Sequence, residues 1–295
     1  MAAATALSKP VDLKSAAESV PERPRPVPAQ PIIQVKGLRK TFKSKNGGLT
    51  VFDDLSCMIE RRSFLSIIGP SGCGKSTLLK LVSGLESPTY GEILFNGRTV
   101  TAPPKGMIYV FQQYTKSIFP WRTVIENVEF GLRAQRSVSF KEARERCREY
   151  IDLVGLKGYE DYYPYQLSGG MQQRVCIARA LICEPEVLLM DEPFSAVDAM
   201  TRAILQELVM RIWQKLPITI LFVTHDVDEA VFLSTRIVSL GRTGSGIAED
   251  VPITLPSPRD QIATRADPRF TELRQRLFGS IFVQEKVQET GAATT

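Results

Sequence analysis

A short glycine-rich stretch carries residues whose types and spacing suit phosphate chemistry. In IIGPSGCGKST, Gly69, Gly74, Lys75 and Ser76 have the spacing GxxxxGK[ST], after an apolar run and before the helical pattern TLLKLVSGL. Glycines let backbone N–H groups converge on phosphate oxygens, and the start of the following helix attracts anions. The lysine can neutralise the β and γ phosphates, while the serine hydroxyl can ligate a bridging Mg²⁺ ion. The predicted contacts for the phosphates of a nucleotide are Gly69, Pro70, Ser71, Gly72, Cys73, Gly74, Lys75, Ser76 and Thr77.

Two acidic residues further along the chain could complete such a site. Asp191 and Glu192 end the apolar run EVLLMDE. An aspartate at a strand end can hold Mg²⁺ through water. The glutamate points in a different direction and can act as the general base toward an attacking water. An acidic pair after a strand is also common on protein surfaces, but its combination with the glycine-rich loop favours a functional site.

The only histidine among the 295 residues, His225, lies just after the apolar run 218–223. This run is rich in β-branched residues, which predicts a strand buried on both faces within a parallel sheet. Ligands of open α/β sheets bind beyond the carboxyl ends of the strands. We therefore predict a catalytic role for His225, beside the alternative of a histidine that only packs at a strand end.

Further apolar runs predict the framework that must position these residues. Near-continuous runs separated by helix-length stretches indicate a buried parallel sheet. These runs are residues 63–69, 106–112, 186–192, 218–225 and 235–241.

A second set of strands predicts an antiparallel layer, formed by residues 32–38, 50–59 and the hairpin 91–100, whose Asn96-Gly97 pair suits a type I′ turn. From about 113 to 167 helical patterns replace the strand signals, which predicts an inserted helical subdomain. The predicted fold is α/β: a P-loop nucleotidase with a parallel sheet core, an antiparallel β layer and that helical insertion, over residues 32–245.

The chain continues on both sides of this unit. Residues 1–31 are rich in alanine, serine and proline and predict a disordered, proline-rich tail. Residues 246–295 predict a C-terminal extension with an amphipathic helix, which Asp267 can cap and Pro268 can begin. Its apolar face is predicted to consist of Phe270, Leu273, Leu277, Phe278 and Ile281.

Charge and composition limit the partners. The net charge is +5, but the densest basic stretch, 133–149, interleaves glutamates with arginines at helical spacing, which favours a solvated helix over nucleic-acid binding. The five cysteines are scattered without metal-binding spacing, as expected for free thiols in a reducing cytosol. Apolar runs all fall short of the roughly 18 residues that cross a bilayer. We expect membrane contact to be indirect.

One long run resembles a known family. YQLSGGMQQRVCIARALICEPEVLLMDEP resembles the signature-to-Walker B region of ATP-binding cassette (ABC) ATPases, and the family's other motifs follow in order over about residues 32–245. The resemblance assigns Phe42 to adenine stacking, Gln112 to catalysis and the metal, and His225 to the switch position. It also implies residues that contact ATP bound to a second chain, where a serine-led helix start can grip phosphate. These are Ser168, Gly169, Gly170, Met171 and Asp198.

Finer details resemble the ATPase subunits of nitrate, sulfonate and taurine importers. They include FQQYTKSIFPWRTVIENVEFGL, DPRFTELRQRLF and Met171, which replaces the signature's usual glutamine. The resemblance implies a homodimer or a heterodimer with a related chain, two sandwiched ATP molecules, and peripheral docking to a membrane permease on the cytoplasmic face of the bacterial cell membrane. A solute-binding protein would deliver the solute to that permease. The alternatives are an exporter ATPase, a non-transport ABC ATPase and a nucleotide-dependent interaction protein; the transported solute stays open.

Overall fold

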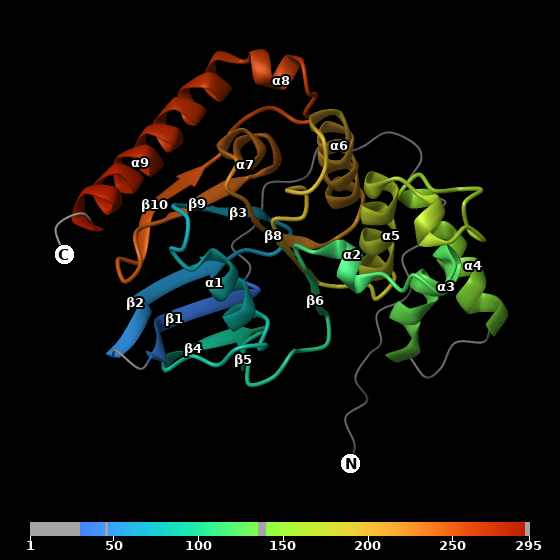
Figure 1. Ribbon diagram of the computed structural model, residues 1–295, viewed down its shortest axis with the longest axis horizontal. Helices are drawn as coiled ribbons and strands as arrows, with labels where there is room; N and C mark the ends of the chain where they lie inside the picture. The colour runs from blue at the N-terminus through green and yellow to red at the C-terminus, as the bar shows by residue number, and fades with distance from the viewer. Residues whose placement is uncertain (1–29, 45–46, 135–139, 293–295) are drawn as a thin grey trace.

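The computed structural model describes residues 30–44, 47–134 and 140–292. They form two sheets with helices packed around them (Figure 1). Residues 1–29, nearly all of the predicted proline-rich tail, lie outside the described residues.

The larger sheet has six strands in the order β10-β9-β3-β8-β7-β6. Neighbours from β9 to β6 are parallel, and β10 pairs antiparallel with β9. All residues of β3, β7 and β8 are buried, as their apolar runs predict. The strands are β3 (Phe64–Ile68), β6 (Met107–Val110), β7 (Val187–Asp191), β8 (Thr219–Val223), β9 (Arg236–Leu240) and β10 (Ile247–Pro252).

Strand β10 has no counterpart in the sequence prediction, and it carries the sheet past residue 245. Along its residues IAEDVP, positions that are at least partly buried alternate with exposed ones, as in an edge strand with one face toward solvent. Such a short, acidic, proline-ended run lacks the continuous apolar pattern that revealed the inner strands.

The smaller sheet is antiparallel, in the order β2-β1-β4-β5, and confirms the predicted second layer. Asn96 and Gly97, between β4 and β5, have φ values of 51° and 74°, as the predicted tight turn requires. The strands are β1 (Ile33–Ser44), β2 (Gly47–Ile59), β4 (Tyr90–Phe95) and β5 (Arg98–Thr99).

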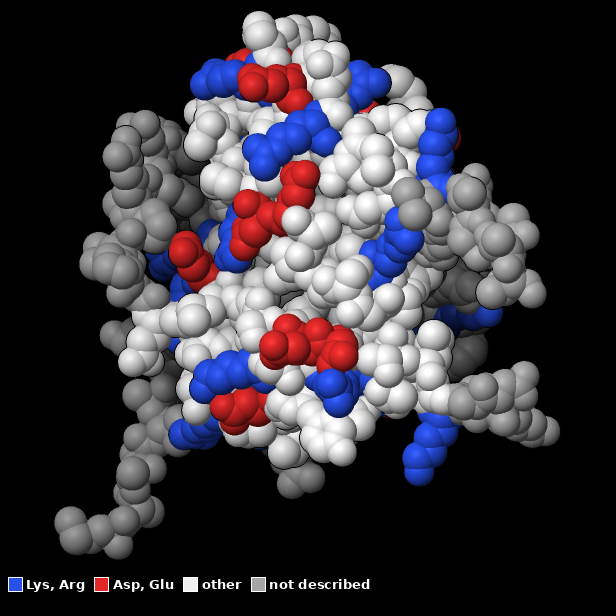
Figure 2. Space-filling model, turned by 90° about the vertical axis from the view of Figure 1, so that its left-hand side faces the viewer, with Lys and Arg blue, Asp and Glu red and all other residues white. Residues whose placement is uncertain are grey.

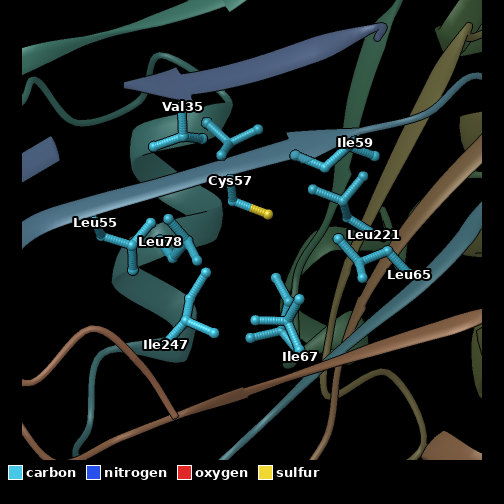
Figure 3. A pocket seen from close by; sticks show the side chains of 11 residues that line it. Val35, Leu55, Cys57, Ile59, Leu65, Ile67, Leu78, Leu221 and Ile247 are labelled. Carbon is cyan, nitrogen blue, oxygen red and sulfur yellow. The ribbon is translucent and has the colours of Figure 1, made fainter. Parts of the chain in front are cut away.

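A compact apolar core joins the two sheets to helix α1 (Lys75–Val82). Figure 3 shows side chains from both sheets and α1, among them Val35, Leu65, Leu78 and Leu221, directed at one small cavity of about 10 Å³. The cavity is about the size of a single water molecule and its lining is apolar. This core fixes α1, and hence the glycine-rich loop before it, against the end of β3.

Helices occupy the stretch between β6 and β7, at the right of Figure 1. Within the described part of residues 113–167 there is no strand, as predicted. The helices are α2 (Tyr114–Ser117), α3 (Val124–Glu129), the 3₁₀ helix η2 (Phe130–Ala134), α4 (Phe140–Leu153), the 3₁₀ helix η3 (Pro164–Gln166) and α5 (Gly169–Leu181).

The remaining helices follow β7 along the chain. They are α6 (Ala199–Lys215), α7 (Val227–Leu233), α8 (Ala263–Ala266) and α9 (Pro268–Ala292). Helix α9 begins at Pro268 as predicted, and Asp267 Oδ1 accepts a hydrogen bond from the Arg269 backbone N–H at 2.9 Å. It packs against α7.

The predicted apolar face of α9 is wrong at one residue, Phe278. Phe270 and Leu277 are buried in the main core, with Leu273 and Ile281 packed against it, but Phe278 is 58% exposed. Phe278 lies one position past Leu277, about 100° around the helix, which carries it out of the narrow buried stripe. It stacks on Phe282 instead, with 6.0 Å between ring centroids.

This neighbouring pair of residues gives a matched test of how α9 is held. Leu277→Ala should lower the free energy of unfolding by about 2–5 kcal/mol, because it leaves a cavity under α9. Phe278→Ala removes an exposed ring and should change it by about 0.5 kcal/mol or less. Chemical denaturation of both variants measures the difference. Equal losses would contradict the packing of α9 described here.

The surface carries charges of both signs. On the side that lies at the left in Figure 1, basic and acidic side chains are interspersed among uncharged ones (Figure 2). Ion pairs join neighbouring strands, such as Arg236 to Asp250 across β9 and β10. Among the described helices, none is both long and apolar enough to span a bilayer.

Candidate functional site

The glycine-rich loop connects the carboxyl end of β3 to α1. Gly74, the residue before α1, has a φ of 105°, in the left-handed region that favours glycine. A Cβ there would lie 2.4 Å from Val51 Cγ1 and 2.8 Å from Phe52 Cζ, so only glycine lets the loop approach the antiparallel sheet this closely. No side chain caps α1, which leaves its first backbone N–H groups free for an anionic ligand.

The loop borders an open hollow of about 480 Å³. Residues from three strand ends meet there: the loop after β3, Glu192 after β7 and His225 after β8. Its lining is Ser71, Gly72, Gly74, Lys75, Ser76, Thr77, Glu192 and His225.

Lys75 is buried and binds its own loop. Its Nζ donates hydrogen bonds to the backbone carbonyls of Gly69 at 2.8 Å and Pro70 at 2.9 Å. Cys73, within the same loop, is buried in the core beside α1, and burial raises the pKa of its thiol. The lysine thus holds the glycine-rich loop curled, with its charge beside the hollow.

Asp191 ends β7 with both carboxylate oxygens engaged. Ser76 Oγ donates to Oδ1 at 2.8 Å, and the hydroxyl of Tyr109, on β6, donates to Oδ2 at 2.8 Å. Burial and the nearby carboxylate raise the pKa of Tyr109, so its hydroxyl keeps the proton that it donates. The sequence prediction missed Tyr109; a lone polar tip within the apolar run GMIYVFQ is the signal that could have found it.

Glu192 contacts both of the other predicted catalytic side chains, His225 and Gln112. Its Oε2 lies 3.1 Å from His225 Nδ1 and accepts a hydrogen bond from Gln112 Nε2 at 3.2 Å. The backbone of Glu192 has a φ of 43°, rare for a residue with a side chain, and its N–H donates to Val223 O at 2.9 Å. The strained turn therefore aims Glu192 away from the line of Asp191 and toward the β8 end that carries His225.

Phe42 lies on β1, outside the lining of the hollow. Its ring is 38% exposed, and Lys40 Nζ lies 4.7 Å from the ring centroid. An exposed ring backed by a cation on one side can stack a flat base on the other.

The residues expected to contact ATP bound to a second chain lie outside the lining of the hollow. Ser168 caps α5, accepting from the Met171 N–H at 3.3 Å, and Asp198 caps α6, accepting from the Thr201 N–H at 3.0 Å. A Cβ on Gly170 would lie 2.3 Å from Thr201 Cγ2, so the two helix starts touch through this glycine. Gly170 itself is buried, whereas Ser168 and Gly169 at the start of α5 and Asp198 before α6 are accessible and lie outside the hollow's lining.

The donor set beside the loop fits a magnesium ion. Mg²⁺ prefers oxygen ligands. Ser76 Oγ lies 2.8 Å from the Asp191 carboxylate, and Gln112, just after β6, bonds to Glu192, the residue that follows Asp191. Because the Ser76 hydroxyl donates its hydrogen bond to Asp191, the lone pairs of its oxygen remain available to a metal.

Comparison with known proteins identifies the family. Residues 52–195 match the family model described as ABC transporter. The nitrate import ATP-binding protein of Synechocystis sp. is 41% identical over 88% of this chain and 98% of its own length. An aliphatic sulfonates import ATP-binding protein of Bacillus cereus is 40% identical over 83% of this chain and 94% of its own. This chain belongs to the ABC transporter family. It is an ABC ATPase, so ATP is the nucleotide of its phosphate-binding loop.

A solved ABC ATPase supports the same fold. It is a dimeric ATP-binding cassette in a post-hydrolysis state with ADP and phosphate bound. Its TM-score is 0.66 at 30% identity, and the match covers 75% of this chain and 98% of that one. The predicted architecture of the ABC ATPase is thus confirmed.

Proposed function

We propose that this chain is the ATP-hydrolysing subunit of a membrane importer for a small solute such as nitrate, an alkyl sulfonate or taurine. The main observation behind this proposal is the hollow beside the glycine-rich loop. Lys75, Glu192 and His225 all line this one space, which is large enough for a triphosphate. Two relatives named as import ATP-binding proteins, for nitrate and for aliphatic sulfonates, support the direction of transport and the solute class. The subunit would act at the cytoplasmic face of the bacterial cell membrane.

In the proposed reaction Glu192 accepts a proton from the attacking water. Its carboxylate already binds His225 and Gln112, which can hold that water and the γ-phosphate in line. Lys75 neutralises the phosphate charge, and Phe42 stacks the adenine. Mg²⁺, when bound through Ser76, Asp191 and Gln112, supplies charge stabilisation for the transferred phosphoryl group.

The active form proposed is a head-to-tail dimer. We propose that two helix starts of one chain bind phosphate, those of α1 and α5, but Ser168 to Met171 and Asp198 do not line the chain's own hollow. A second ATPase subunit turned by a twofold axis would bring that surface onto the partner's ATP. The dimeric state of the similar solved cassette supports this arrangement.

The loop after β6 is the proposed contact with the permease. Ile118 is buried and Phe119 partly buried, but Trp121 is 71% exposed. Buried Asn127 fixes this shape: its Oδ1 accepts from the Phe119 N–H at 2.8 Å, and its Nδ2 donates to the carbonyls of Phe119, Arg122 and Thr123. A rigid loop that presents an indole to solvent suits a partner surface.

Trp121→Ala should therefore weaken co-purification with the permease by at least tenfold, the scale of a central aromatic contact, while basal ATP hydrolysis stays near the wild-type rate. Tyr90→Ala, which removes a similarly exposed ring from the antiparallel sheet, serves as the matched control and should change neither property. Pull-down of the assembled complex and steady-state ATPase rates measure both. Lost hydrolysis with intact co-purification would instead place Trp121 in the packing of the helical region.

A further inference from the structure

Tyr109 occupies the strand face that looks toward the phosphate-binding loop. It sits opposite Leu189 in the parallel register of β6 and β7. Side chains alternate between faces, so Leu189 and Asp191 share a face with Tyr109, whereas Met190 points into the other core. The tyrosine ring is long enough to reach past Leu189, so its hydroxyl meets Asp191 at the strand end.

We propose that Tyr109 is a positioning residue that orients the Asp191 carboxylate for Mg²⁺ and links it to the strand end bearing Gln112. The inference rests on the proposed metal site. It adds a residue that acts through Asp191 and need not touch the nucleotide.

The two donors on Asp191 divide its oxygens. Ser76, at the start of α1, holds Oδ1, and Tyr109 holds Oδ2 from the opposite strand. Asp191 is only 6% exposed, so solvent does little to replace a lost donor. Removing the tyrosine hydroxyl would free the carboxylate to rotate and leave one oxygen of a buried charge less well satisfied. Outer partners of metal ligands act in this way, by fixing ligand orientation.

Tyr109 also contacts Phe111, the residue just after the end of β6. Its ring lies against Phe111, with 4.5 Å between centroids, and Phe111 directly precedes Gln112. Gln112 in turn bonds to Glu192. One side chain therefore connects the aspartate expected to hold the metal with the segment that enters the 118–121 loop, which bears the exposed Trp121. A displacement of that segment would reach Asp191 through a hydrogen bond and a ring contact.

The test is the affinity of Mn²⁺, a paramagnetic stand-in for Mg²⁺, for the full-length protein bound to a non-hydrolysable ATP analogue. Electron paramagnetic resonance titration should show affinity about tenfold lower in Tyr109→Phe. Analogue binding in EDTA should stay within about twofold of wild type, because the phosphate loop is unchanged. Tyr109→Met removes the same hydroxyl with a different shape and should give the same loss. Tyr90→Phe, at an exposed position on β4, is the control.

A double-mutant cycle separates positioning from general packing. In an Asp191→Ala background, Tyr109→Phe should cause no further loss of Mn²⁺ affinity, since the hydroxyl acts only through that carboxylate. A full additional loss of Mn²⁺ affinity in the double variant would overturn the role of Tyr109. So would Mn²⁺ affinity within about twofold of wild type in both Tyr109→Phe and Tyr109→Met. Failure of the wild-type complex to bind Mn²⁺ at all would instead refute the proposed metal site.

Discussion

Glu192→Gln should bind ATP and yet hydrolyse it about 10²- to 10⁴-fold more slowly, the usual contribution of a general base. Glutamine keeps the size of the side chain and can still accept hydrogen bonds from Gln112 and His225 through its amide oxygen. It cannot take a proton from water at neutral pH. With ATP bound and unhydrolysed, the variant should accumulate as a dimer.

Three measurements decide this prediction: steady-state ATPase rates, nucleotide titration, and size-exclusion chromatography with and without ATP. Glu92→Gln, which neutralises an exposed glutamate paired with Lys36 on the antiparallel sheet, is the matched control. Turnover of Glu192→Gln within about threefold of the control would remove Glu192 from the base role.

His225→Ala is expected to retain ATP binding and lose roughly 10- to 1,000-fold in hydrolysis, the range for one preorganised contact to a transition state. His225 lines the hollow, and its side chain is 62% exposed, so it is not held there by packing. Its Nδ1 meets Glu192 at 3.1 Å, which leaves Nε2 available for a phosphate oxygen.

The contrast between affinity and turnover is the readout for His225. A large drop in nucleotide affinity with an unchanged maximal rate would show that the ring binds ATP without assisting its hydrolysis. An ATPase rate within about threefold of wild type would leave His225 as a residue that merely ends a strand.

Strong local patterns explain why much of the fold could be predicted. The buried strands β3, β7 and β8 are near-continuous apolar runs. The glycine-rich loop follows β3, the acidic pair begins with the last residue of β7, and His225 lies just after β8. Carboxyl ends of adjacent parallel strands must meet at one edge. The sequence could thus predict, before any distance was known, that the glycine-rich loop, the acidic pair and His225 share one edge of the sheet.

What the sequence did not reveal depends on long-range packing. Strand β10 forms because the backbone of β9 offers it hydrogen-bond partners at the edge of the sheet. The exposure of Phe278 depends on how narrow the buried stripe of α9 is. Tyr109 and Asn127 look like ordinary members of a strand and a helix. Their partners lie on another strand and in the preceding loop, so only the folded chain shows what they hold.

The hydrogen bonds of Lys75 have a thermodynamic consequence for ligand binding. The ammonium group already makes two bonds, to the carbonyls of Gly69 and Pro70. A triphosphate that draws Lys75 toward it must exchange such bonds rather than add new ones, so the heat released on association is a difference between two well-bonded states. The benefit lies in entropy: the loop and the lysine lose little conformational freedom on binding because these two hydrogen bonds order both of them.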